Sequence, residues 1–210
     1  MKSVWLVVIY VLLVLTACSE ESSQVEGDTE NDLQSIKAEP SHEADEDYYT
    51  EKFRPQYHFS AERGNLADPN GLVYFKGEYH LFFQQNGQWG HAVSKDLIHW
   101  KHLDLALTYG ELGQSLSGSV IVDENDTSGF FDGSPGLVAI YTNSKDGIES
   151  QSIAYSRDNG RTWEKYEGNP VINNPGIKDF RDPKVIWHKK TKKWVMVVST
   201  NKTVQFYSSK

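Results

Sequence analysis

Two aspartates stand in similar surroundings at distant points of the chain. Asp68-Pro69 and Asp182-Pro183 each precede a run of alternating apolar residues that is typical of a half-buried β-strand. Each dipeptide could be only a turn former, because Asp and Pro both favour turns. If the two carboxylates converge in one pocket, however, one can act as a nucleophile or base while another carboxyl acts as an acid, which is the chemistry of glycoside hydrolysis. The chemistry therefore depends on a fold that brings them together.

The elements that would position these aspartates are predicted to be antiparallel β-strands. Alternating apolar runs recur from Phe53 onward, and helical periodicity is hard to find there. Turn signals such as Lys76-Gly77 and Asn159-Gly160 separate the runs. The runs are residues 72–83, 120–122, 137–141, 152–155, 185–187, 194–198 and 204–207. This pattern predicts an all-β fold.

Part of the β-strand pattern repeats. An apolar strand, Ser-x-Asp and then Trp occur at residues 91–100 and again at residues 153–163, and a third copy begins near Ser209. Repeats of about 40 to 60 residues with several strands each are typical of β-propeller blades, although a β-sandwich is the alternative. The first strand of a blade lines the central channel. Because Asp68 and Asp182 occupy matching places in different blades, we expect them to converge.

The first 52 residues differ from the rest of the chain. Residues 1–18 hold one basic residue, an apolar run and the ending Leu-Thr-Ala-Cys, which resembles a bacterial lipoprotein signal with Cys18 as the lipidated residue. A plain signal peptide is the alternative. We therefore expect a lipid-anchored protein at the outer face of the cell membrane. Residues 19–52, with twelve Asp or Glu, are predicted to be a disordered tether.

The charge of the predicted catalytic region, residues 53–210, excludes one class of partner. This region holds 18 basic and 17 acidic side chains, so the net charge of −8 comes from the tether. Nucleic-acid binding requires a basic excess that is missing here. The histidines at positions 80, 91, 99 and 102 have no recognised metal-ligand spacing, and we expect neither a metal nor another cofactor. The sequence makes no prediction about oligomeric state.

Several motifs together resemble glycoside hydrolase family 32, which contains invertases, levanases and inulinases. They occur in the family's order between about Gln56 and Lys210. They are Asp68-Pro69-Asn70-Gly71, the hairpin that ends at Gln84, WGHAVSKDLIHW at 89–100, LSGS at 116–119, SIAYSRDNGRTW at 152–163 and FRDPKV at 180–185. The resemblance implies a five-bladed β-propeller and retaining hydrolysis of β-fructosidic bonds in levan, inulin or sucrose.

The resemblance also implies roles for individual residues. Asp68 matches the nucleophile, and Asp182 matches the carboxylate that stabilises the transition state. A fixed negative charge beside an oxocarbenium-like transition state fits the second role. The positions that match the fructose subsite are Asn70, Gln84, Trp89, Leu116, Ser117 and Arg181. The Arg181 guanidinium is expected to bond neighbouring carboxylates and keep them ionised.

The sequence departs from the family pattern in two places that matter for function. Residues 65–67, Asn-Leu-Ala, replace the usual aromatic and amide ahead of Asp68, so substrate preference is expected to differ. The family's general acid lies in a Glu-Cys motif beyond the repeat near Tyr207, and no such dipeptide occurs here. With roughly 55 residues a blade, five blades would extend to about residue 330. We therefore expect the first two to three blades of a catalytic domain, inactive alone.

Two other functions remain open from the sequence. One is an inverting, five-bladed glycosidase of the arabinanase or xylosidase type, which the stereochemistry of the product would distinguish. The other is a sugar-binding lipoprotein without catalysis. A Glu-Cys motif soon after residue 210 would favour the fructosidase over the binding protein.

Overall fold

The computed structural model describes residues 49–209, which contain eleven β-strands and no helix. Within this part of the chain, therefore, no helix is long and apolar enough to cross a membrane. The predicted signal at residues 1–18, with Cys18, and residues 19–48 of the predicted tether lie outside the described residues. The prediction of an all-β fold is confirmed.

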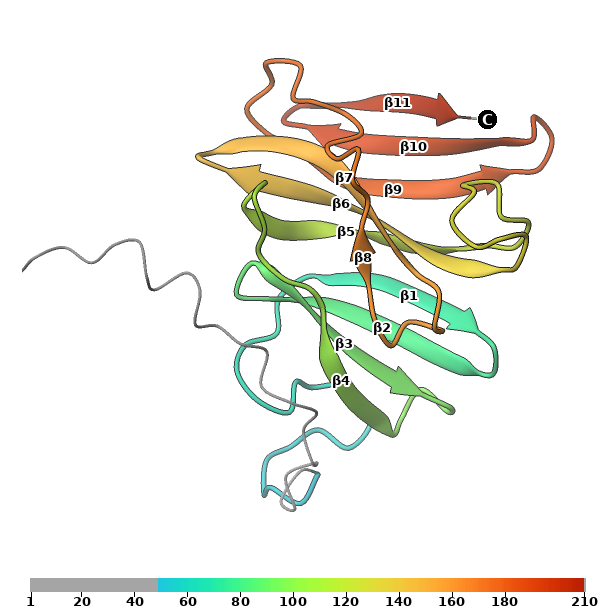
Figure 1. The fold of residues 1–210 in the computed structure, drawn as a ribbon. Helices are drawn as coiled ribbons and strands as arrows, with labels where there is room; N and C mark the ends of the chain where they lie inside the picture. The colour runs from blue at the N-terminus through green and yellow to red at the C-terminus, as the bar shows by residue number, and fades with distance from the viewer. Residues whose placement is uncertain (1–48, 210) are drawn as a thin grey trace, which may run out of the picture. The chain divides into compact units, whose positions relative to one another are not determined.

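The strands form three antiparallel sheets in chain order, which we call blades 1 to 3 (Figure 1). Blade 1 contains β1 (Pro69–Phe75), β2 (Glu78–Gln85), β3 (Gln88–Ser94) and β4 (Trp100–Leu107). Blade 2 contains β5 (Gln114–Asp123), β6 (Gly136–Lys145), β7 (Ile148–Ser156) and β8 (Glu164–Lys165). Blade 3 contains β9 (Phe180–His188), β10 (Lys193–Thr200) and β11 (Thr203–Ser209). Each sheet is a meander in which sequential strands pair.

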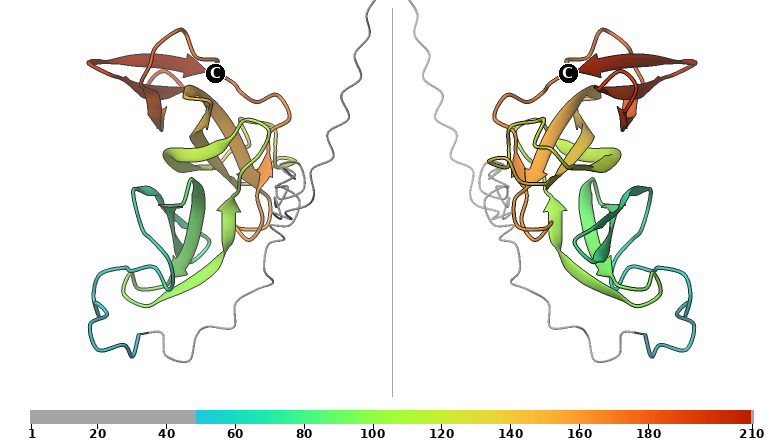
Figure 2. Two further views of the ribbon diagram at one scale, coloured as in Figure 1. Left: turned by 90° about the vertical axis from the view of Figure 1, so that its left-hand side faces the viewer. Right: turned by 90° about the vertical axis from the view of Figure 1, so that its right-hand side faces the viewer.

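The first strands of the three blades are neighbours. Strand β5 contacts β1 on one side and β9 on the other. Figure 2 shows the sheets from two further sides, and blade 2 lies between blades 1 and 3 in both views. This succession of meanders, each with its first strand on the inside, is the arrangement predicted from the repeat. Residues 49–209 thus form part of a β-propeller.

A core of aromatic and aliphatic side chains joins blades 1 and 2. Phe82, Trp89 and Tyr141 are fully buried, and the ring centroids of Trp89 and Tyr141 lie 6.0 Å apart. Leu107 and Leu137 complete the centre of this cluster. Each such side chain stabilises the fold by about 1.5 to 3 kcal/mol when fully buried. The two blades are therefore expected to behave as one packed unit.

The repeated Ser-x-Asp and Trp elements are structural. In Ser94–Asp96 and in Ser156–Asp158, the serine hydroxyl donates to the aspartate carboxylate at 3.0 and 2.8 Å. The indole N–H of Trp100 donates to a backbone carbonyl three residues earlier, and that of Trp163 does the same. The motif therefore closes the turn after the third strand of each blade and is not a second catalytic element.

Each inner strand begins with a β-bulge. In β1, β5 and β9, two consecutive residues lie opposite a single residue of the paired strand. The two-residue segments are residues 70–71, 116–117 and 182–183, and the single residues opposite them are Phe82, Thr142 and Val198. A bulge bends its strand and redirects side chains, and it commonly lies near an active site. The predicted site residues cluster at these three bulges.

Candidate active site

A cavity of about 270 Å³ lies where the inner strands begin. Asp68 and Asp182 both line it, so the convergence expected from the repeat is present. The other lining residues come from the same bulges and from the loops beside them. They are Asn65, Ala67, Gln84, Asn86, Gly87, Leu116, Ser117 and Arg181.

Asp68 is held in place from two blades. Its carboxylate accepts a hydrogen bond from the Ser117 hydroxyl, with 2.9 Å between Oγ and Oδ2. Its backbone carbonyl accepts the N–H of Gln84 at 2.9 Å, which ties the residue to β2 just before β1 begins. Oδ1 has no hydrogen-bond partner within residues 49–209. The serine therefore fixes the orientation of the carboxylate and leaves one oxygen free to react.

Two buried side chains of blade 1 support the bulge of β5. The Gln84 amide donates to the carbonyl of Ser115, and the Trp89 indole donates to the carbonyl of Leu116, each at 2.9 Å. These bonds hold the bulge so that the Ser117 hydroxyl reaches the Asp68 carboxylate. They also satisfy carbonyl groups that the bulge leaves without a ladder partner.

Two of the predicted subsite residues do not line the cavity. Trp89 is completely buried in the core, so its ring offers no face to a sugar there. The Asn70 amide is also buried, and neither its nitrogen nor its oxygen has a partner among the described residues. The structure gives Trp89 a supporting position behind Leu116. The sequence could not distinguish these positions, because buried and lining aromatic residues have the same local pattern.

Asp182 adopts a backbone conformation that few residue types tolerate. Its φ angle is +61°, in the left-handed region where Asn, Asp and Gly are favoured. The Thr142 hydroxyl accepts its backbone N–H at 3.1 Å, so blade 2 holds the first residue of this bulge. An aspartate therefore meets both the backbone requirement and the chemical one.

The electrostatic surroundings of Asp182 make ionisation harder. Partial burial raises the pKa of its carboxyl, and the negative charges of Asp68 and Glu149 raise it further. The Arg181 guanidinium opposes these effects, but they outweigh it. The repulsion from Asp68 also indicates that the two candidate carboxylates act on one another through the cavity.

Arg181 binds two carboxylates that the sequence reasoning did not name. Its guanidinium donates to Glu149 on β7 and to Asp179 just before β9. The expectation that Arg181 bonds neighbouring carboxylates is confirmed, but these partners are not the two candidate catalytic residues. Glu149 lies far away in the sequence on another blade, and no local pattern singled it out.

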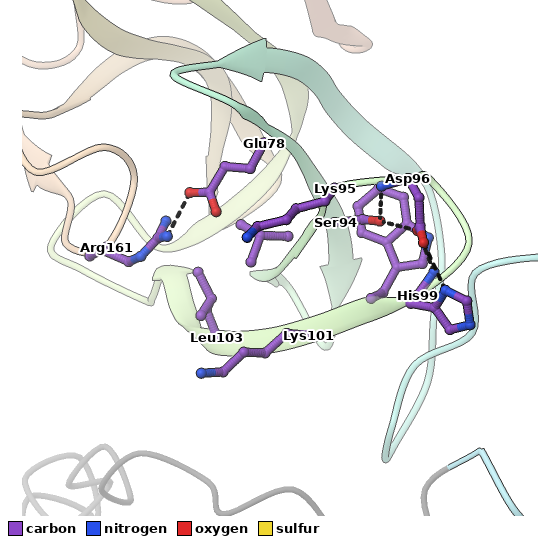
Figure 3. A pocket seen from close by; sticks show the side chains of 10 residues that line it. Glu78, Ser94, Lys95, Asp96, His99, Lys101, Leu103 and Arg161 are labelled. Atoms are coloured by element: carbon purple, nitrogen blue, oxygen red, sulfur yellow. Dashed lines mark hydrogen bonds and ion pairs between the residues drawn. The ribbon is translucent and has the colours of Figure 1, made fainter.

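A second and larger cavity, of about 490 Å³, lies at the outer strands of blade 1 (Figure 3). Its acidic side chains already have partners, because Glu78 pairs with Arg161 at 2.5 Å and Asp96 pairs with His99 at 2.8 Å. No pair of unpartnered carboxylates converges on it from the described residues. The smaller cavity is therefore the better candidate for carboxylate chemistry.

The histidines form no metal centre in the described part of the chain. Within residues 49–209, no three His, Cys, Asp or Glu side chains are grouped so that they could hold a metal ion. His80 and His91 are buried and in contact, with 3.1 Å between Nδ1 and Nε2. Burial lowers the pKa of both rings, which favours the neutral form expected of core residues.

The chain is similar to known proteins over almost all of its described residues. Residues 58–210 match the family profile described as "Glycosyl hydrolases family 32 N-terminal domain". The chain is 56% identical over 176 residues to a levanase of Bacillus subtilis strain 168, a match that covers 80% of this chain and 26% of that protein. It is 49% identical over 176 residues to a levanase of Bacillus sp. strain L7, covering 77% of this chain and 19% of that protein.

The fold also matches a solved structure. The β-fructofuranosidase of Schwanniomyces occidentalis complexed with fructosyl-erythritol matches with a TM-score of 0.69 and 43% sequence identity, over 74% of this chain and 34% of that one. The chain thus spans about a quarter of the first levanase and about a third of this structure. The matched residues 58–210 include both candidate carboxylates.

Proposed function

Because the chain belongs to glycoside hydrolase family 32, we propose that it takes part in hydrolysis of β-fructosidic bonds in levan or a related fructan. Asp68 is the proposed nucleophile, and Asp182 is the proposed stabiliser of the transition state. Family 32 contains levanases, and structures of its members include complexes with fructosyl compounds. A fructosyl unit is therefore the proposed occupant of the smaller cavity.

The observation that supports this proposal is that Asp68, directly before β1, and Asp182, in the bulge of β9, line one cavity from two blades. Either aspartate alone could serve as a turn former. The pKa of the Asp182 carboxyl is raised, in part by the charge of Asp68 across the cavity, and carboxyls with such a shift cluster at functional sites.

The proposed reaction is a double displacement. Oδ1 of Asp68 attacks the anomeric carbon, an ester bond forms, and the bond to the leaving oxygen breaks with its electron pair. Water then attacks the same carbon, the bond to Asp68 breaks with its electron pair, and fructose leaves with its configuration retained. The proton that this water loses balances the proton that the leaving oxygen takes up in the first step. Asp182 contributes negative charge beside the ring as positive charge develops on it. Ser117 keeps Asp68 oriented throughout.

The leaving oxygen also needs a proton, and the cavity lining described within residues 49–209 offers no carboxyl besides the two candidates to supply it. The acidic residues that line it within residues 49–209 are Asp68 and Asp182 alone. Glu149 is buried and bonded to Arg181 and to the Phe180 N–H, so it is not free to donate. Removal of a general acid costs about 10²- to 10⁴-fold in rate. Turnover of natural fructans by the 210-residue chain is therefore proposed to be weak.

A substrate with a leaving group that needs no proton tests the proposal directly. The 210-residue chain is incubated with a fructosyl fluoride, fluoride release is followed, and the protein is analysed by mass spectrometry. We expect fluoride release and one fructosyl group on the peptide that contains Asp68. Asp68→Asn should abolish both signals.

Asp104→Asn is the matched control, because Asp104 is exposed on β4 outside the cavity, and it should behave as the unaltered chain does. Binding of fructose without fluoride release or an adduct would refute the catalytic proposal and favour a sugar-binding protein. Release of product with inverted configuration would favour the arabinanase type of mechanism.

The proposed location of the protein rests on its first residues. The lipoprotein-like ending at Cys18 supports export and lipid attachment at that cysteine. A lipid anchor at the outer face of the membrane suits an enzyme whose polymeric substrate is outside the cell. The residues concerned lie outside the described part of the chain.

A further inference from the structure

Three buried polar side chains of blade 2 hold the backbone at the start of β9. Glu149 accepts the N–H of Phe180 at 2.8 Å, and Gln151 donates to the carbonyl of Phe180 at 2.7 Å. Thr142 accepts the N–H of Asp182 at 3.1 Å and donates to Gln151 at 3.0 Å. All three side chains are buried. The segment that carries Asp182 is thus attached to blade 2 by side-chain bonds in addition to its own sheet.

Glu149 has a second contact that the other two lack. One of its oxygens binds the Phe180 N–H, and the other accepts the Arg181 guanidinium. Its side chain is 6% exposed, so it is a carboxylate buried at the junction of two blades. A buried carboxylate is costly unless it is paired and hydrogen-bonded, and both conditions are met here. One side chain therefore fixes the residues on the amino side of Asp182 through the backbone and through Arg181.

Glu149 also affects the ionisation of Asp182. Its carboxylate binds one terminal nitrogen of the Arg181 guanidinium, while Asp179 binds the other. Its own negative charge adds to that of Asp68 in raising the pKa of the Asp182 carboxyl. Asp179 binds the same guanidinium but is not among the groups that act on Asp182. The two partners of Arg181 are therefore distinguishable.

We propose that Glu149 is a positioning residue for Asp182, which sets the place and the charge state of that carboxylate by holding Phe180 and Arg181 across the junction of blades 2 and 3. The inference rests on the proposed function for its catalytic consequence. Glu149 does not line the cavity and touches no reacting atom. A merely structural bond between blades would add stability and leave the titration of Asp182 unchanged.

The test measures the titration of Asp182 itself. The chain is labelled with ¹³C in the aspartate side chains, and the Asp182 signal is identified by its loss in Asp182→Asn. The titration midpoint is then compared in the unaltered chain, in Glu149→Gln and in Asp179→Asn. Glu149→Gln keeps the shape of the side chain and removes its charge.

We expect Glu149→Gln to lower the midpoint of Asp182, because one negative charge is lost and Arg181 then pairs with Asp179 alone. Asp179→Asn should leave the midpoint where it is. Fluoride release from the fructosyl fluoride should fall about 10- to 100-fold in kcat for Glu149→Gln, since small displacements near a reacting group have effects of that size. The KM should change little, because Glu149 does not contact the sugar.

Two outcomes would overturn the proposal. One is a titration midpoint of Asp182 that is unchanged in Glu149→Gln. The other is a downward shift of that midpoint in Asp179→Asn as large as the shift in Glu149→Gln. If Glu149→Gln does not fold, Glu149→Asp replaces it. That variant keeps the charge and loses reach, so kcat should fall while the midpoint stays high. If the unaltered chain releases no fluoride, the proposed function fails, and the midpoints still decide the role of Glu149.

Discussion

Replacement of Asp182 by asparagine should stabilise the protein at neutral pH. The structure places a partly buried carboxylate beside Asp68 and Glu149, and these surroundings raise the pKa of the Asp182 carboxyl. When folding raises the pKa of a carboxyl, the protonated form does not destabilise the folded protein. The folded protein loses stability as the pH rises through the folded-state pKa and the carboxyl ionises. Asparagine removes the charge, and it tolerates the φ angle of +61° as aspartate does.

The magnitude follows from the electrostatics. Asp182 is exposed, and interactions between exposed charges are screened and typically amount to about 0.2 to 1 kcal/mol, which is the expected gain. The gain for Asp182→Asn should vanish near about pH 3, below the unfolded-state pKa, where the native carboxyl is also neutral. Asp182→Ala should be about 1 kcal/mol less stable than Asp182→Asn at every pH, because alanine does not favour the left-handed region.

Urea denaturation at a series of pH values measures these differences. The reasoning is refuted if Asp182→Asn is no more stable than the unaltered chain at neutral pH. It is also refuted if the gain persists unchanged in acid, since the origin would then not be the carboxylate charge. Asp104→Asn is a suitable control, because Asp104 is an exposed carboxylate on β4 outside the cavity.

Two further predictions concern other parts of the chain. Gly118 follows the bulge of β5, and a Cβ there would lie 2.1 Å from the carbonyl oxygen of Ile140. Gly118→Ala should therefore lower the free energy of unfolding, measured by urea denaturation, by about 1 to 3 kcal/mol. An unchanged free energy of unfolding would contradict this close approach. Cys18→Ser should move the protein from the membrane fraction to the supernatant of the producing cells, and retention at the membrane would disprove lipid attachment at that residue.

The sequence predicted the strands and the meeting of the two aspartates for a physical reason. Alternation of apolar and polar residues reports directly which face of a strand is buried. The repeat predicted matching places for Asp68 and Asp182 in different blades, and both line one cavity. The places are not the same in register, because Asp68 lies just before β1 and its bulge, while Asp182 lies in the bulge of β9. Ser117 was also predicted near the site, and it is the residue that bonds Asp68.

The supporting side chains could not be predicted in the same way. Glu149 and Thr142 act across the junction between blades, where contact depends on strand register and on the bulges. A single extra residue in a strand shifts the register, and nothing in the alternation of apolar residues reports it beforehand. Trp89 shows the same difficulty, because its pattern fits a lining residue and a core residue equally well.

The bulges have a consequence for how this scaffold can be altered. Strands β5 and β9 present Ser117 and Asp182 from β-bulges, and side chains of the adjoining blade hold the backbone at both bulges. The supporting bonds come from the second and third strands of the adjoining blade, β2, β3, β6 and β7, and not from β4 or β8. A designer could therefore exchange the residues at one bulge as a cassette, with the neighbouring two left intact, and so vary ligand preference blade by blade.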